Sequence, residues 1–114
     1  MRVIVLSGNV TIGAADLAQL DPPMGVAMGS FEPSGCYDQH AHANVIEGEY
    51  VGDNGTSLVA ISDAYGKFGC VGIAIEDFSE SIGERQLTLF GISYPEYAQY
   101  FGEYDGYKAY YPTK

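Results

Sequence analysis

The sequence is short of positive charge. Five Lys and Arg residues face fifteen Asp and Glu residues, which gives a formal net charge of -10. The five cations are scattered along the chain and form no basic stripe of the kind that neutralises nucleic-acid phosphates. A strongly negative protein repels polyanions and attracts cationic molecules. The composition therefore argues against DNA or RNA as a ligand and favours a basic partner.

Long apolar runs are also missing. A membrane-spanning helix needs about 20 apolar residues in a row, and nothing in the sequence approaches this length. The apolar run Val3 to Leu6 is too short for the core of a signal peptide. We therefore expect a cytoplasmic protein that does not contact a membrane. In that compartment Cys36 and Cys70 are expected to be free thiols.

The common catalytic signatures are absent as well. No Gly-x-Ser-x-Gly motif is present to form the nucleophile elbow of a serine hydrolase. Residues 8–13 form a glycine-bounded loop after an apolar run, but Ala14 and Ala15 stand where a phosphate-binding loop requires Lys and Ser or Thr. We interpret this loop as a simple turn. The sequence predicts a protein that is not an enzyme and carries no cofactor.

Length and turn content indicate the fold class. A chain of 114 residues is the size of one domain, so we predict a single domain over 1–114. Fifteen Gly and five Pro favour many turns and short elements. We predict an α+β fold in which an antiparallel sheet of four to six strands packs against one or two short helices. The predicted strands form a meander over 44–92, with members at 44–52, 57–64, 70–77 and 86–92.

Local patterns refine this expectation. The Asn54-Gly55 pair predicts a tight hairpin between the first two strands of the meander. Helices are expected over 14–20 and from Ser93 to about Gly102, where Pro95 is tolerated in the first turn. In the segment 24–31, alternate residues are glycine or alanine, which indicates close approach by a backbone element or a ligand. Packing of a helix on the sheet is the simpler explanation for these small residues.

One short segment has the residue types of a metal or nucleophile site. Cys36, Asp38, His40 and His42 lie at alternate positions, so on a strand they would share one face. Residues four apart on a strand are separated by about 13 Å, so one ion could bind all four only if the segment curled. Cys36 with His40 or His42 could also form a nucleophile pair, although acidic surroundings raise the pKa of a thiol.

Tyrosine is concentrated near the C-terminus, where seven of the ten tyrosines fall in the last 21 residues. Tyr97, Phe101 and Tyr104 have the i, i+4, i+7 spacing of a helix face that packs on a sheet. Tyrosine also provides contact area at low entropic cost in binding surfaces. The predicted partner-binding residues are Tyr100, Glu103, Tyr104, Asp105, Tyr107, Tyr110 and Tyr111.

Charge and tyrosine content together predict a non-catalytic, acidic protein-binding domain. An inhibitor or immunity-type protein that neutralises a basic partner would have this composition. Two alternatives remain open. The first is a homo-oligomeric structural or accessory subunit, such as a homodimer. The second is a small metalloprotein or enzyme centred on Cys36, His40 and His42.

Overall fold

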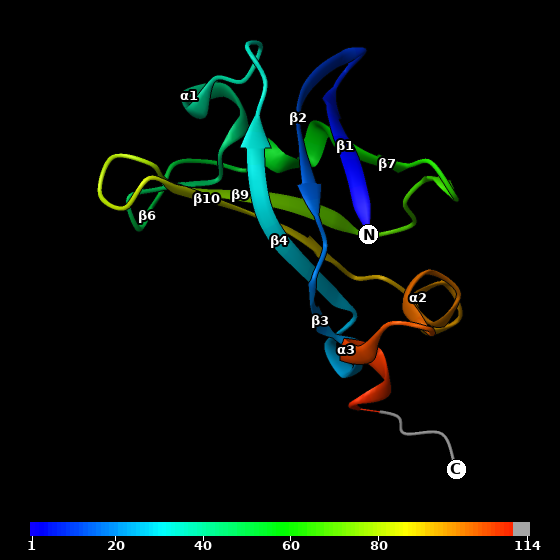
Figure 1. Cartoon of the computed structure of the whole chain (residues 1–114). Coiled ribbons are helices and arrows are strands. Elements are labelled where there is room, and N and C mark those ends of the chain that lie inside the picture. The colour runs from blue at the N-terminus through cyan, green and yellow to red at the C-terminus, as the bar shows by residue number, and fades with distance from the viewer. Residues whose placement is uncertain (111–114) are drawn as a thin grey trace.

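The computed structural model describes residues 1–110, apart from the side chains of Thr56 and Tyr94. Within this range the chain forms short strands, three α-helices and two 3-10 turns (Figure 1). The strands are β1 (Arg2–Ser7), β2 (Val10–Asp16), β3 (Gln19–Asp21), β4 (Val26–Pro33), β5 (Val45–Ile46), β6 (Glu49–Tyr50), β7 (Leu58–Ser62), β8 (Gly66–Lys67), β9 (Gly72–Phe78) and β10 (Glu84–Phe90). The helices and 3-10 turns are α1 (Gln39–His42), α2 (Tyr94–Phe101), α3 (Asp105–Lys108), η1 (Pro22–Met24) and η2 (Asn54–Ser57).

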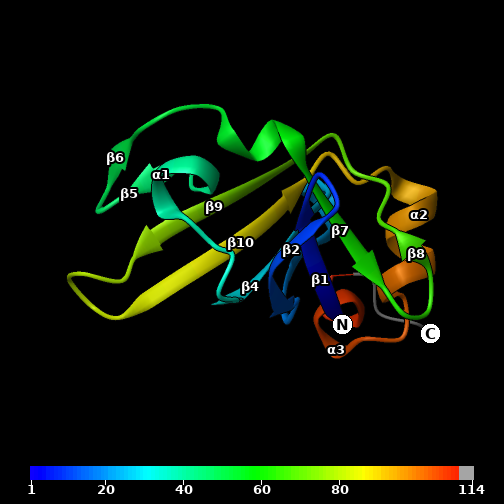
Figure 2. The same ribbon diagram turned by 90° about the horizontal axis from the view of Figure 1, so that it is seen from above.

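The ten strands form one continuous sheet with the order β6-β5-β9-β10-β4-β2-β1-β7-β8, and β3 pairs with β4 beside this path. Strand β4 links the two halves, because one of its edges pairs with β10 while the other pairs with both β2 and β3. The pairing of β5 with β9 is parallel and the other pairs are antiparallel. The β9–β10 hairpin is long, and its loop lies at one end of the molecule near β5 and β6 (Figure 2).

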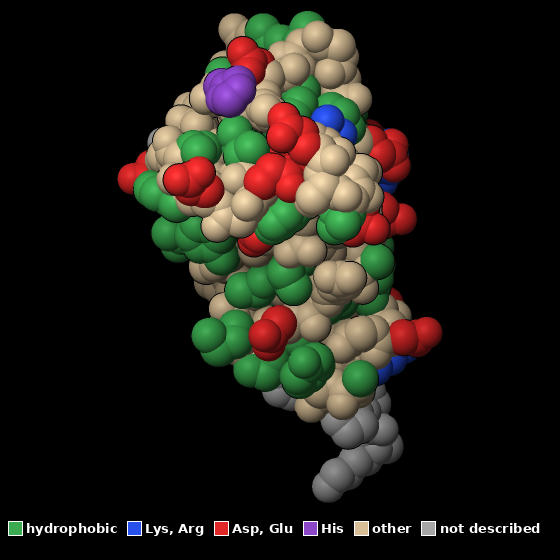
Figure 3. All heavy atoms as spheres, turned by 90° about the vertical axis from the view of Figure 1, so that its left-hand side faces the viewer, with side chains coloured by type: hydrophobic (Ala, Val, Ile, Leu, Met, Phe, Trp, Pro, Cys, Tyr) green, Lys and Arg blue, Asp and Glu red, His purple; other side chains and the backbone are tan. Residues whose placement is uncertain are grey.

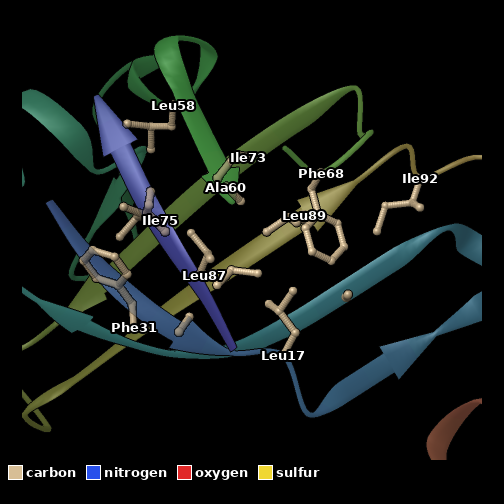
Figure 4. Close-up of a cluster of buried hydrophobic side chains, with 14 of the residues drawn as sticks. Leu17, Phe31, Leu58, Ala60, Phe68, Ile73, Ile75, Leu87, Leu89 and Ile92 are labelled. Atoms are coloured by element: carbon tan, nitrogen blue, oxygen red, sulfur yellow. The ribbon is translucent and has the colours of Figure 1, made fainter. Parts of the chain in front are cut away.

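The core lies inside the curl of this sheet. Alternate residues of β9 and β10 point inward, so Ile73, Ile75, Leu87 and Leu89 are buried while their neighbours face outward. Side chains from β7 meet those of β9 and β10 across the core (Figure 4). Helix α2 covers the inner side near the C-terminal end of β10 and adds the buried rings of its own apolar stripe. Period-two alternation in the sequence predicts one inward face with Val71, Ile73 and Ile75. Ile73 and Ile75 are buried as predicted, but Val71 lies before β9 and is 83 % exposed.

The predicted fold is confirmed in part, because a sheet with short helices forms. Strands overlap three of the predicted ranges, 57–64, 70–77 and 86–92. The predicted antiparallel meander over 44–92 is wrong. The sheet has ten strands and one parallel pair, where four to six antiparallel strands were expected. The 44–52 segment does not form one strand, because Glu47 and Gly48 adopt positive φ values of 51° and 83° and turn the chain between β5 and β6. Strand β7 then leaves this region to pair with β1, so β9 and β10 alone keep the predicted hairpin pairing.

The predicted Asn54-Gly55 hairpin is also wrong, because the pair begins the 3-10 turn η2. The Asn54 side-chain amide donates a hydrogen bond to the carbonyl oxygen of Ala43 at 2.8 Å. This long-range hydrogen bond holds the turn η2 against the segment before β5. A tertiary interaction therefore overrides the local turn preference of the two residues.

One of the two predicted helices is confirmed. Helix α2 (Tyr94–Phe101) carries Pro95 in its first turn, as expected, although the Ser93 side chain makes no capping hydrogen bond. Residues 14–20 are not helical, because they end β2 and form most of β3, where strand partners satisfy their backbone groups. Helices α1 and α3 were not predicted from the sequence.

The small residues before and within β4 serve close backbone packing. A Cβ atom at Gly29 would overlap the carbonyl oxygen of Asp16. Gly25 adopts a φ of 67°, and a Cβ there would lie 2.6 Å from the carbonyl oxygen of Ile92. The chain segments that approach these glycines are the backbone of Asp16 and Ile92, neither of which is helical. The simpler explanation, a helix packed on the sheet, is therefore wrong for these two positions, and the alternative of a close backbone approach is confirmed.

Candidate functional site

A buried carboxylate links the segment before α1 to the β9–β10 hairpin. Asp77 is fully buried at the inward-facing end of β9. Its side chain accepts hydrogen bonds from the Tyr37 hydroxyl at 2.7 Å, the Arg85 Nε at 3.1 Å and the Ser79 backbone N–H at 2.9 Å. The Arg85 guanidinium also lies 5.5 Å from the centre of the Tyr37 ring, within range of a cation–π interaction.

These contacts fix the ionisation of the cluster. Burial raises the pKa of Asp77, but the hydrogen bonds from Ser79 and Tyr37 and the charge of Arg85 outweigh it, so the net shift is downward. The pKa of Tyr37 is raised by burial and by its hydrogen bond to Asp77. The cluster is therefore a carboxylate with neutral phenol and cationic guanidinium donors. Because Arg85 forms an ion pair with Asp77, this cation is not available to pair with surface carboxylates.

The outward face of β9, β10 and β4 presents a different set of side chains. Phe78 lies opposite Glu84, while Gln86 lies between Glu76 and Ser30 in the strand register. Glu84 and Ser30 are exposed, and Glu76, Phe78 and Gln86 are half-buried. This face turns away from the core that α2 covers. We call these five residues the outer patch.

A groove of about 440 Å³ runs over the outer patch. Its apolar lining comes from Phe78 and from Ile82, which is 64 % exposed in the β9–β10 loop. Gln19 from β3 contributes a carboxamide at the opposite edge. Arg85 also lines the groove, with its charge compensated by Asp77. The groove therefore combines two carboxylates with an aromatic ring and amide groups.

Other carboxylates lie on β6 and around the β9–β10 loop, at the same end of the molecule as the groove but outside its lining (Figure 2). Glu49 belongs to β6, and Glu80 lies in the β9–β10 loop beside Glu47. The Glu47 carboxylate accepts hydrogen bonds from the backbone N–H groups of Glu80 and Ser81 at 2.9 and 3.3 Å, which orders this loop. Figure 3 looks onto this end and shows acidic side chains spread among hydrophobic ones, with few cations.

Much of the scarce positive charge is already paired within the molecule. Arg2 pairs with Glu32 at 3.0 Å, Arg85 with Asp77 at 3.1 Å, and Lys108 with Glu103 at 3.6 Å. Among residues 1–110, no ion pair involves Glu76 or Glu84. The groove therefore keeps its negative charge.

The Cys36–His42 segment does not have the geometry of a strand. Asp38 caps α1 by accepting a hydrogen bond from the His40 backbone N–H at 3.0 Å, and its own N–H donates to His42 Nδ1 at 3.0 Å. Cys36 is exposed before this helical turn. Within the described part of the chain, no group of three or more His, Cys, Asp or Glu side chains is arranged to hold a metal ion.

Some of the residues predicted to form a C-terminal contact surface are buried in the structure, and others are exposed. Tyr100 is 8 % exposed, accepts a hydrogen bond from the Gly69 N–H at 3.2 Å and packs against Phe68, so it belongs to the core. Tyr97 and Phe101 are buried, as their helical spacing predicted, whereas Tyr104, the third residue of the predicted stripe, lies beyond the end of α2 and is exposed. Tyr107 is half-buried with its ring stacked on that of Tyr97.

Four predicted contact residues remain on the surface. Tyr104 and Tyr110 are 37 % and 51 % exposed, and Glu103 and Asp105 are exposed beside them. Tyr111 lies outside the described residues. The sequence pattern identified neither the outer patch nor the Asp77 cluster as a site. The available signal for the cluster was the aspartate that follows Ile73 and Ile75 at the next inward position of β9.

The two cysteines should differ in reactivity. Cys36 is exposed, whereas Cys70 is half-buried and burial raises the pKa of its thiol despite the nearby charge of Lys67. Because the thiolate is the reactive form, we expect Cys36 to react with a thiol reagent about tenfold faster than Cys70. Stopped-flow labelling of the wild type should show two phases, and Cys36→Ser should lose the fast one. Loss of the slow phase instead would contradict this assignment.

Comparisons with protein-family models, curated protein sequences and solved structures find no match. Over residues 1–110, the helices are too short or too polar to cross a lipid bilayer. The function is therefore argued from the geometry and charge of the site.

Proposed function

We propose that this protein is a non-catalytic binding protein whose partner is a basic protein. The observation that carries the proposal is a groove lined by the carboxylates of Glu76 and Glu84, in which the only cation among the described lining residues, Arg85, is neutralised by Asp77. A negative field of this kind attracts cationic partners and accelerates their association. An inhibitor or immunity-type protein that covers a cationic surface is one form of this function.

A basic partner fits this surface better than a second copy of the chain. Two copies would each bring a formal charge of -10, and their acidic ends would repel one another. The exposed Tyr104 and Tyr110 offer a second contact area near Glu103 and Asp105. Aromatic side chains are enriched in protein interfaces, so this area could add to binding.

Binding of simple charged peptides tests the proposal. We expect fluorescently labelled hexa-arginine to bind at about 50 mM salt and to lose at least about tenfold in affinity at about 500 mM salt, because salt screens exposed charges. Hexaglutamate of the same length is the control and should not bind. Fluorescence anisotropy measures both affinities. A protein that ignores hexa-arginine, or binds it equally at both salt concentrations, would not have the proposed function.

A further inference from the structure

We infer that the groove over the outer patch binds an arginine side chain of the basic partner. This inference rests on the proposed function and specifies where and through which side chain the partner docks. It depends on the alternation of charged and planar groups across β9 and β10. In the strand register, Glu84 lies opposite Phe78 and Glu76 lies opposite Gln86.

The chemistry of these residues favours guanidinium over ammonium. A guanidinium group is planar and donates two parallel hydrogen bonds to one carboxylate, which a lysine ammonium cannot do in the same geometry. Its flat face also stacks on aromatic rings, and Phe78 lies beside the Glu84 carboxylate on the same face. The Gln86 and Ser30 side chains provide acceptors for the remaining N–H groups.

The shape of the site strengthens the expected ion pair. An ion pair on an open surface contributes little, because water screens it. Here Glu76, Phe78 and Gln86 are half-buried, and they line a concavity of about 440 Å³. A guanidinium that enters this groove is partly shielded from water, so its attraction to Glu76 and Glu84 is less screened.

The charge around the groove identifies the class of occupant. Glu47 contacts the β9–β10 loop at Glu80, and Glu49 lies on β6 at the same end of the molecule (Figure 2), so an anionic lipid surface or a second acidic copy would be repelled. Arg85 does not cancel this field, because its guanidinium forms an ion pair with Asp77 at 3.1 Å. A basic protein segment with an exposed arginine is therefore the occupant that fits.

A charge-matched pair of double variants tests this site. Glu76→Gln with Glu84→Gln changes the groove, whereas Asp63→Asn with Asp16→Asn changes exposed carboxylates outside the groove lining and outside the tyrosine contact area. Each pair removes two negative charges and shifts the formal charge from -10 to -8. Calorimetric titration with hexa-arginine should show at least about tenfold weaker binding for the groove variant and at most about twofold for the control.

Two further variants separate the outcomes. Wild-type protein should prefer hexa-arginine to hexalysine by about fivefold, and Phe78→Leu should remove this preference while keeping the site apolar. If the groove double variant does not fold, the single Glu84→Gln change at an exposed position replaces it. Equal weakening by the groove and control pairs would overturn the docking site and leave the proposed function intact. Failure of the wild type to bind either peptide would overturn both.

Discussion

Replacing Asp77 with alanine should lower the free energy of unfolding by about 3 kcal/mol, because it leaves a partly buried cation without its counter-ion. The Arg85 side chain is only 26 % exposed, and the Tyr37 hydroxyl would also lose its acceptor. The change removes the contacts that hold the segment before α1 against the β9–β10 hairpin. Urea unfolding followed by circular dichroism measures the loss.

Asp77→Asn and the pH dependence of stability provide the control. The amide oxygen can still accept hydrogen bonds, so we expect about half the loss seen for alanine. The pKa of Asp77 is lower in the folded protein than in the unfolded chain. The carboxylate therefore stabilises the fold fully above its unfolded pKa of about 4, and this contribution disappears as pH falls through the folded pKa.

The difference in stability between wild type and Asp77→Asn should accordingly shrink as pH falls from about 5 to about 2. Comparing two proteins that share their other titrating groups isolates the contribution of this one carboxylate. Equal stability of the two proteins at neutral pH, or a difference that does not change with pH, would contradict the assigned role.

Gly29→Ala should lower the free energy of unfolding by about 3 kcal/mol, the upper range for overpacking a tight site. The new methyl group would overlap the carbonyl oxygen of Asp16, and both groups belong to backbone held by sheet pairing. Gly35→Ala is the matched control, because Gly35 is exposed and no atom outside its chain neighbours lies within 4 Å of the added methyl.

The control should stay within about 0.5 kcal/mol of the wild type, as is usual for surface substitutions. Guanidinium unfolding of the three proteins makes the comparison. If Gly29→Ala were as stable as Gly35→Ala, the backbone at the end of β2 would not lie against Gly29 as the structure shows.

Local pattern was sufficient to predict some of the fold. The inward face of β9 follows from the alternation at Ile73 and Ile75, and α2 follows from Pro95 with the spacing of Tyr97 and Phe101. Each of these signals depends on neighbouring residues alone. The strand order does not, because the pairing of β7 with β1 and of β5 with β9 joins segments far apart in the sequence.

The candidate site likewise has one feature that the composition predicts and others that depend on residues far apart in the sequence. Net charge is a property of the composition, so a basic partner could be expected from the sequence. The placement of Tyr100 in the core could not, because it depends on Phe68 and the Gly69 N–H, which lie in a distant loop. The groove could not be predicted from the sequence either. Its carboxylates, Glu76 and Glu84, lie next to Gln86 and Phe78 only because of the strand register of the β9–β10 hairpin.

The most direct test of basic-partner recognition is to map where an arginine peptide contacts the protein. Amide chemical shifts of ¹⁵N-labelled protein should be followed during titration with hexa-arginine. We predict that the largest changes fall at Glu76, Phe78, Glu84 and Gln86, and that salt abolishes them. Changes confined to Tyr104 and Tyr110, or no changes at all, would contradict recognition through the acidic groove.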